Sequence, residues 1–393
     1  MSDKNPFLNQ LVLELYFRAG QIPSLIDIPI RVIDSPQIAN EILKNSEIFR
    51  KNYPFLEKLS HGRLSTNSPE WETRAKLTQN FYHQSTHLIE DKQLHEIYER
   101  YLSRCFGIEK ISLKRALLLS AIEVISRSYG FRESVPWDLD LAEEISGILR
   151  SEQSDAWLVP IANEGSLSKP NARLKEAHEI IRKSWLDSLE LNTFLEKLSS
   201  KAGEIPEFDA AGELIQNLFA ASETTTSSMM WAVDILGRNP SYQHLLRGVE
   251  GDALADLFID ELLRLYPPIP FVTREVFCDY ELEHIQFKKS ETILISIIGI
   301  NCHRNYWKDA LSFQFPRQEF ADNSYKTIAY KPFLSGPRVC GGMKLARREL
   351  KSALRMILKL FDIGLIEAPL QIEYSLTSRP SINLDQYLER RST

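Results

Sequence analysis

The sequence predicts a mainly α-helical protein with small β-sheets, folded as a single large domain over residues 1–393. Long segments carry apolar residues at helical spacing, whereas short runs rich in β-branched residues gather towards the two ends of the chain. No long Gly/Ser/Pro-rich linker, low-complexity block or internal repeat divides the chain. With 43% hydrophobic residues, a chain of this length can bury a sizeable core.

The elements follow in chain order. A short strand is predicted at 29–33, where Ile30 and Val32 alternate with Arg31, and Ser35-Pro36 then opens a helix through Leu43. Polar, turn-rich stretches are predicted at 52–69 and 151–171. Further helices are predicted at 71–82, 110–128, 138–149, 172–189, 209–236 and 343–359. Strand character is found at 280–282, 292–295, 364–366 and 370–376.

Composition excludes several classes of protein. The 47 basic residues against 53 acidic residues give a net charge of -6, and no long basic run is present, so nucleic acid is not an expected partner. The 4 cysteines show no C-x-x-C spacing, which argues against a zinc ribbon or a disulfide framework and fits a reducing compartment. The apolar residues at 11–13 are interrupted by Glu14 and Arg18, and no signal-peptide core is visible. We therefore expect a soluble, cytoplasmic protein without a membrane anchor.

The loop 333–342, Phe-Leu-Ser-Gly-Pro-Arg-Val-Cys-Gly-Gly, holds the most informative residue, Cys340. Gly336 and Gly342 allow the backbone to approach a large flat partner closely. The start of the predicted helix at 343 and the charge of Arg338 both favour a thiolate, which is the form of cysteine that binds metals. The alternative is that Cys340 is a small buried hydrophobic residue in a glycine turn.

A second signal lies in the predicted helix 209–236, where a polar run, Ser-Glu-Thr-Thr-Thr-Ser-Ser, follows Phe219, Ala220 and Ala221. Such hydroxyl residues are poor helix formers, and a local conflict of this kind often marks a functional site. The alternative is a new helix start capped by Ser222, with Glu223 in its first turn.

The cysteine loop resembles the haem-binding loop of the cytochrome P450 family of haem-thiolate monooxygenases. The residues that fit the family pattern F-x-x-G-x-R-x-C-x-G-x-x-x-A-x-x-E are Phe333, Gly336, Arg338, Cys340, Gly342, Ala346 and Glu349. The resemblance implies the cytochrome P450 fold and haem b (iron protoporphyrin IX), with Cys340 as the ligand of the iron.

The polar run is similar to the oxygen-activation motif of the same family, [AG]-G-x-[DE]-T-T, although Ala221 replaces the usual glycine. The resemblance implies that Ala220 and Ala221 lie beside the iron. It also implies that Thr224 supplies a hydroxyl to bound oxygen, and that Glu223 relays protons from solvent.

A structural ion pair is implied by the family's E-x-x-R motif at Glu261 and Arg264, which share a helix face at i and i+3. The alternative is a solvent-exposed ion pair, which contributes little to stability. The family pair usually enlists a later arginine, and Arg317 is the counterpart here, one position early, so its contact with Glu261 is left open.

The two propionates of a haem need cations or hydrogen-bond donors. The resemblance implies Arg338 and Arg274 for this purpose. The family also uses W-x-x-x-R, whereas Trp71 and Arg74 are one residue closer together. The alternative for this pair is a packed tryptophan and a solvated arginine.

The function implied is a monooxygenase that inserts one oxygen atom from O2 into a hydrophobic small molecule, as a monomer, with a role in secondary metabolism. Electrons would come from a ferredoxin or flavodoxin served by an NAD(P)H-dependent reductase. A basic docking face is predicted on the helix 343–359, with an ordinary solvated helix as the alternative. Its residues are Lys344, Arg347, Arg348, Lys351 and Arg355.

Other functions compete with this one. Within the same family, the chain could be a natural-product tailoring enzyme that performs coupling, dehydration or peroxide-driven chemistry. Outside catalysis, it could be a haem sensor or carrier, or a helical binding protein without haem.

Overall fold

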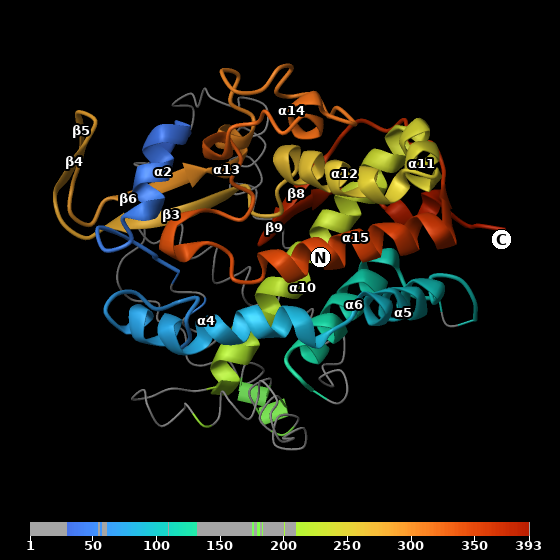
Figure 1. The fold of residues 1–393 in the computed structure, drawn as a ribbon, viewed down its shortest axis with the longest axis horizontal. Helices are drawn as coiled ribbons and strands as arrows, with labels where there is room; N and C mark the ends of the chain where they lie inside the picture. Colours follow the sequence, from blue (N-terminus) through green and yellow to red (C-terminus); the bar gives the residue numbers. More distant parts are fainter. Residues whose placement is uncertain are drawn as a thin grey trace.

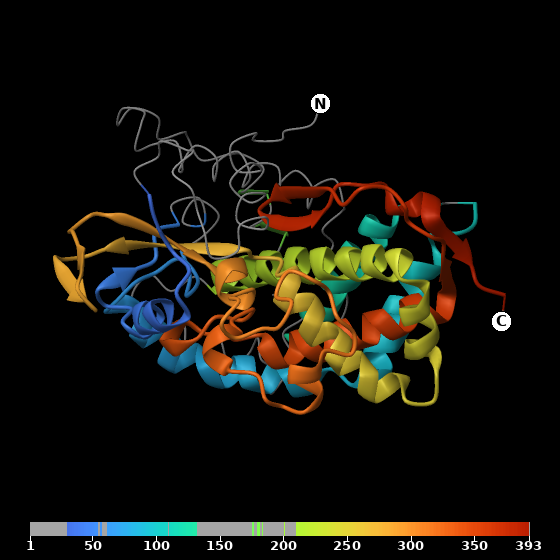
Figure 2. The same cartoon turned by 90° about the horizontal axis from the view of Figure 1, so that it is seen from above.

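The computed structural model describes residues 30–53, 56, 61–108, 110–131 and 210–392, with a few single positions between 175 and 200. The mainly α-helical architecture with small sheets is confirmed (Figures 1 and 2). The helix expected at 138–149, the loop expected at 151–171 and most of the helix expected at 172–189 lie outside the described residues.

The helices occupy most of the positions that the sequence predicts. Their bounds are α2 (Pro36–Lys44), α4 (Glu70–Leu88), α5 (Asp91–Ser103), α6 (Leu113–Ser128), α10 (Ala210–Arg238), α11 (Pro240–Arg247), α12 (Gly251–Leu265), α13 (Ile297–Asn301), α14 (Gln318–Ala321) and α15 (Met343–Leu360). Short 3-10 turns are η2 (Thr327–Ala329), η3 (Gly336–Arg338) and η4 (Leu384–Tyr387).

Helix α5 was not predicted from the sequence. It begins after a capping box, in which the side chains of Glu90 and Gln93 each accept from the other's backbone N–H. Its buried residues recur at helical spacing, so that one face packs on the core while the rest of the helix is polar. These buried residues are Leu94, Ile97, Tyr98 and Leu102.

The largest sheet has the strand order β1-β6-β3-β2, with β1 parallel to β6 and the other two pairs antiparallel. Its strands are β1 (Arg31–Ile33), β2 (Phe49–Arg50), β3 (Phe271–Val276) and β6 (Thr292–Ser296). The hairpin of β4 (Tyr280–Leu282) and β5 (Ile285–Phe287) extends from this end of the molecule (Figure 1).

Two further strand pairs form near the C-terminus: β7 (Phe361–Ile363) with β10 (Leu388–Arg390), and β8 (Ile372–Ser375) with β9 (Thr377–Pro380). The strand predicted at 364–366 is wrong. After Ile363 the chain leaves the β10 ladder, because the N–H of Ile366 donates to the carbonyl of Gly237 at the end of α10 (3.0 Å). That contact is tertiary and leaves no mark on the local sequence.

Helix α10 runs through the middle of the molecule (Figure 2). It packs on α6, α15 and β9, which places it in the main hydrophobic core. Trp231 stacks on Tyr266 with ring centroids 4.3 Å apart, and its indole N–H donates to the carbonyl of Ser378 (3.0 Å). In the described part of the chain, no helix combines the length and the apolar character that crossing a membrane requires.

Candidate functional site

The Cys340 loop is fixed by close backbone contacts. Gly336 has φ +72°, and a Cβ added there would lie 2.4 Å from the carbonyl oxygen of Leu43, so only glycine fits. The N–H of Cys340 donates to the carbonyl of Phe333 (2.9 Å), which closes the loop. Phe333 itself packs against the main core. The sulfur is thereby held two residues ahead of Gly342, the N-cap of α15.

Two opposing effects act on the Cys340 thiol. The side chain is accessible to solvent. Burial of the sulfur among protein atoms nevertheless raises its pKa, against the lowering by backbone N–H groups of Gly342 and Met343 and by the charge of Lys51. The expected thiolate-favouring donors are thus present, but burial outweighs them. Binding to a metal ion would deprotonate the sulfur outright.

Arg274 and Arg338 carry buried nitrogens without a hydrogen-bond partner. These atoms are Nη2 of Arg274 and Nε of Arg338. Burial lowers the pKa of Arg338 to about 9, and the nearby charge of Arg274 adds to this effect. Buried donors of this kind are costly unless they meet an acceptor. They fit a cofactor that brings carboxylates, as haem does.

The indole of Trp71 contacts the guanidinium of Arg338, whose Cζ lies 4.0 Å from the ring centroid. Arg74, by contrast, is fully buried between two acids: its Nε is 2.7 Å from Glu70 and its Nη1 is 3.1 Å from Glu213 of α10. The solvated arginine that was the alternative is therefore wrong.

Sequence reasoning missed Lys51 and Arg63. Lys51 Nζ donates to the carbonyl of Leu64 (3.1 Å), and burial together with the charges of Arg338, Arg274 and Arg63 holds its pKa well below its usual value. The guanidinium of Arg63 lies 5.0 Å from the ring centroid of Tyr82. No local pattern distinguishes these two residues from surface cations.

One face of α10 stays accessible in an otherwise buried stretch. Asn217, Ala220, Ala221 and Thr224 are half-buried, whereas most of the surrounding helix, Glu223 included, is buried. Their spacing of three and four residues puts them on one side of the helix. The sequence-predicted Ala220, Ala221 and Thr224 therefore share this face.

The hydroxyl groups of the polar run bond back to the helix itself. Ser222 Oγ donates to the carbonyl of Leu218 (2.7 Å) and Thr224 Oγ1 donates to that of Ala220 (2.8 Å). Helix α10 therefore continues through the run, and the alternative of a new helix capped by Ser222 is wrong.

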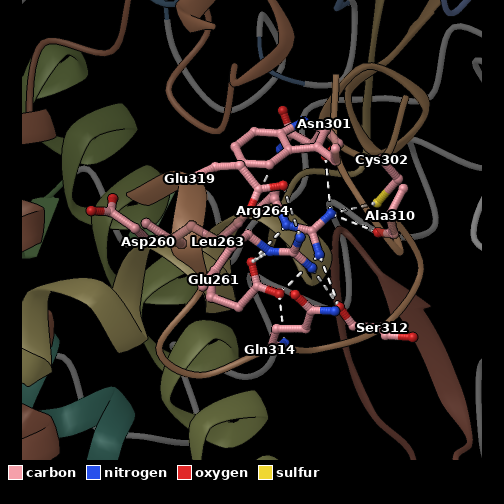
Figure 3. A network of polar contacts seen from close by, with 12 residues as sticks. Asp260, Glu261, Leu263, Arg264, Asn301, Cys302, Ala310, Ser312, Gln314 and Glu319 are labelled. Carbon is pink, nitrogen blue, oxygen red and sulfur yellow. Dashed lines mark hydrogen bonds and ion pairs between the residues drawn. The ribbon is translucent and has the colours of Figure 1, made fainter. Parts of the chain in front are cut away.

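Glu261 on α12 forms a fully buried ion pair with two arginines (Figure 3). Its carboxylate is 2.6 Å from Nε of Arg264 and 2.7 Å from Nε of Arg317, which answers the question left open for Arg317. The remaining guanidinium N–H groups donate mainly to backbone carbonyls, those of Ala310 and Ser312 among them. The network ties α12 to the segment before α14.

A buried carboxyl group also joins α15 to its neighbours. Glu349 accepts from the hydroxyl of Tyr98 on α5 (2.8 Å) and bonds with Thr225 on α10. Burial raises the pKa of Glu349 to about 8. The sequence identified Glu349 only as a motif position, and its partners come from helices distant in the chain.

Comparison with known proteins agrees with this geometry. Residues 253–380 match the cytochrome P450 family. A curated relative, cytochrome P450 CYP749A22 of Panax ginseng, is 25% identical over 91% of this chain and 77% of its own length. Cytochrome P450 CYP72A616 of Paris polyphylla is 34% identical, but the match covers 37% of this chain and 32% of that protein.

A solved structure shares the fold. The six-coordinated cytochrome P450 from Thermus thermophilus superposes with a TM-score of 0.70 over 92% of both chains at 18% identity. In sequence over residues 253–380, and in fold over most of its length, the chain is similar to the cytochrome P450 family. It is accordingly an oxidoreductase of the monooxygenase class, and its cofactor is haem b, which this family binds through a cysteine thiolate.

Proposed function

We propose that this cytochrome P450 inserts one oxygen atom from O2 into an apolar small molecule, with electrons from a separate redox protein. The observation that carries the proposal is the accessible face of α10, where Ala220, Ala221 and Thr224 interrupt a buried helix. Small side chains there leave room for a small ligand, and the hydroxyl offers a hydrogen bond to it.

Cys340 would hold the haem iron through its sulfur, while Arg274 and Arg338 would bind the cofactor's carboxylates. The haem supplies oxygen binding and O–O cleavage, which a thiolate ligand favours. The backbone N–H groups of Gly342 and Met343 bond to the sulfur and would stabilise its negative charge.

Thr224 would hold and pass a proton at Oγ1. In this structure its hydroxyl donates to the carbonyl of Ala220 within the same helix (2.8 Å). That bond is extra to the helical backbone ladder, so the hydroxyl can turn towards a ligand without breaking the helix. Glu223, buried one residue earlier, would supply protons to this hydroxyl.

The docking face on α15 is less positive than its sequence indicates. Arg347 pairs with Asp260 (2.7 Å), Arg348 with Asp91 (2.6 Å), Lys351 with Asp256 (2.7 Å), and Arg355 with Asp252. Lys344 makes no ion pair with any residue that the structure describes. Arg348 also donates to the carbonyl of Ile89 beyond α4 (2.9 Å), so reversing its charge would disturb packing as well as docking.

We infer that a ferredoxin or flavodoxin docks near Lys344, the exposed cation at the Cys340 end of α15. Lys344→Glu should slow reduction of the haem by a ferredoxin, with a salt dependence weaker than that of the parent. Lys359→Glu is the control at the other end of the helix, where the same change of charge also removes the ion pair of Lys359 with Glu99 (2.6 Å). Equal reduction rates for Lys344→Glu and the parent would reject this docking site.

The test of the proposed function begins with the reduced, carbon monoxide-treated protein. A red-shifted Soret band is expected from the parent and from the Cys278→Ser control, and its loss is expected in Cys340→Ser. Binding of hydrophobic compounds should then change the spin state, and NAD(P)H should be consumed with a surrogate ferredoxin and reductase. A normal band without any spin change or turnover across a broad set of apolar compounds would favour a haem sensor or carrier.

A further inference from the structure

Four cations gather around the Cys340 loop, and none of them forms an ion pair with a described residue. They are Lys51, Arg63, Arg274 and Arg338. Aromatic rings and backbone carbonyls separate them instead. The guanidinium groups of Arg63 and Arg338 both lie near the indole of Trp71, with their Cζ atoms 5.9 Å and 4.0 Å from its ring centroid.

Lys51 and Arg274 likewise contact an aromatic residue, Tyr53, and not an acid. Lys51 Nζ lies 5.9 Å from the ring centroid of Tyr53, and the hydroxyl of Tyr53 accepts from Nη1 of Arg274 (3.3 Å). Arg274 and Arg338 are buried, whereas Lys51 and Arg63 are half-buried. Cation–π contacts and carbonyl bonds compensate such charges only in part. The four cations thus form a single electropositive cluster, which bound anionic groups would stabilise.

The turn 62–66 carries one of these cations, Arg63, and is held by hydrogen bonds to α10. The N–H of Arg63 donates to Glu213 (2.8 Å), and the N–H of Leu64 donates to Gln216 (3.1 Å). In return, the carbonyls of this turn accept from Lys51 and Arg338, with Thr66 receiving Nη2 of Arg338 at 2.8 Å.

Glu213 also forms an ion pair with Arg74. Glu213 and Glu70 bring two negative charges to one guanidinium, which is therefore neutralised inside the protein. The next residue on α4 is Ala75, which is buried and carries no charge. Helix α4 consequently has no uncompensated arginine to offer to an anion at this point.

We propose that Lys51 and Arg63 bind the two carboxylates of the haem together with Arg274 and Arg338, and that Arg74 instead anchors α4 to α10. This inference rests on the haem binding in the proposed function. Among the described residues the four cations have no ion-paired acid of their own, so two ionised propionates would supply the opposite charge that this cluster lacks.

The test compares holoenzyme carrying haem b with holoenzyme carrying haem dimethyl ester, in which both propionates are neutral. The rate of haem loss to an excess of apomyoglobin is measured for Lys51→Gln, Arg63→Gln and Arg74→Gln, with Lys44→Gln as a surface control. Lys51→Gln and Arg63→Gln should each speed the loss of haem b at least tenfold, but the loss of the ester less than twofold. Arg74→Gln should change both rates by the same factor, because it acts through packing.

Equal effects of Lys51→Gln and Arg63→Gln on both cofactors would overturn the proposal, and so would an ester-dependent effect of Arg74→Gln. If a glutamine variant fails to fold with haem, Lys51→Arg and Arg63→Lys replace it. These two variants should lose haem b at a rate within threefold of the parent's rate. Loss as fast as the loss of the ester from the parent protein would count against the proposal. A parent protein that shows no thiolate-type carbon monoxide spectrum would instead reject the proposed function.

Discussion

The buried carboxyl group of Glu349 makes the stability of this protein depend on pH. Burial raises its pKa to about 8, from an ordinary 4.5, and the group is 3% exposed. Between these two values the folded protein keeps the proton while the unfolded chain releases it. The free energy of unfolding therefore falls as pH rises from about 4.5 to about 8, and the contribution is constant above that. The full difference corresponds to about 5 kcal/mol, or about 1.4 kcal/mol for each pH unit.

Glu349→Gln keeps the shape and the hydrogen-bonding capacity of the protonated side chain but cannot ionise. We expect the variant to match the parent near pH 5 and to exceed its stability progressively up to pH 8, by about 2–5 kcal/mol. Urea unfolding of the haem-loaded proteins at intervals from pH 5 to pH 9 measures this difference. Glu389→Gln, at an exposed position on β10, is the matched control. Parallel stability curves for the parent and Glu349→Gln would refute the reasoning.

Three further predictions concern other parts of the site. Glu261→Gln leaves two buried arginines without their carboxylate, so urea unfolding should show a loss of about 3–5 kcal/mol; a loss below about 1 kcal/mol would contradict this. Gly336→Ala combines a strained positive φ with a contact of 2.4 Å to the carbonyl of Leu43, and purified protein should carry little haem. Thr224→Ala should leave the carbon monoxide spectrum unchanged but lower the product formed per NADH or NADPH consumed several-fold; unchanged coupling would remove Thr224 from the proton path.

The helices could be predicted well because their signals are local. Ser35 caps α2 as expected, since its side chain accepts from the N–H of Ile38, and α15 follows its apolar stripe to within one residue. Helix α5 was overlooked, although Glu90 and Gln93 form a capping box that the sequence contains. The end of the strand near residues 364–366 has no local signal, because its boundary is set by pairing with β10 and with the end of α10.

The candidate site could be predicted where a motif fixes the geometry. Cys340 and Gly336 lie in one loop, and the residues of the α10 face lie on one helix. Their spacing along the chain therefore determines their relative positions in space. Arg317 is displaced by one position from the family pattern but still reaches Glu261, because an arginine side chain is long enough to absorb that shift. Lys51 and Arg63 could not be found in this way, since they meet Arg274 and Arg338 only after the chain has folded.

The arginines of this protein show what determines their roles. Arg264 and Arg317 share one buried carboxylate and serve packing, and Arg74 has two acids of its own. Arg274 and Arg338 form no ion pair with any acid among the described residues, unlike Arg74. The residue type is the same in every case, and burial is similar. What makes an arginine available to a cofactor is therefore the position of the acidic side chains, which the folded structure reveals and the spacing of arginines along the chain does not.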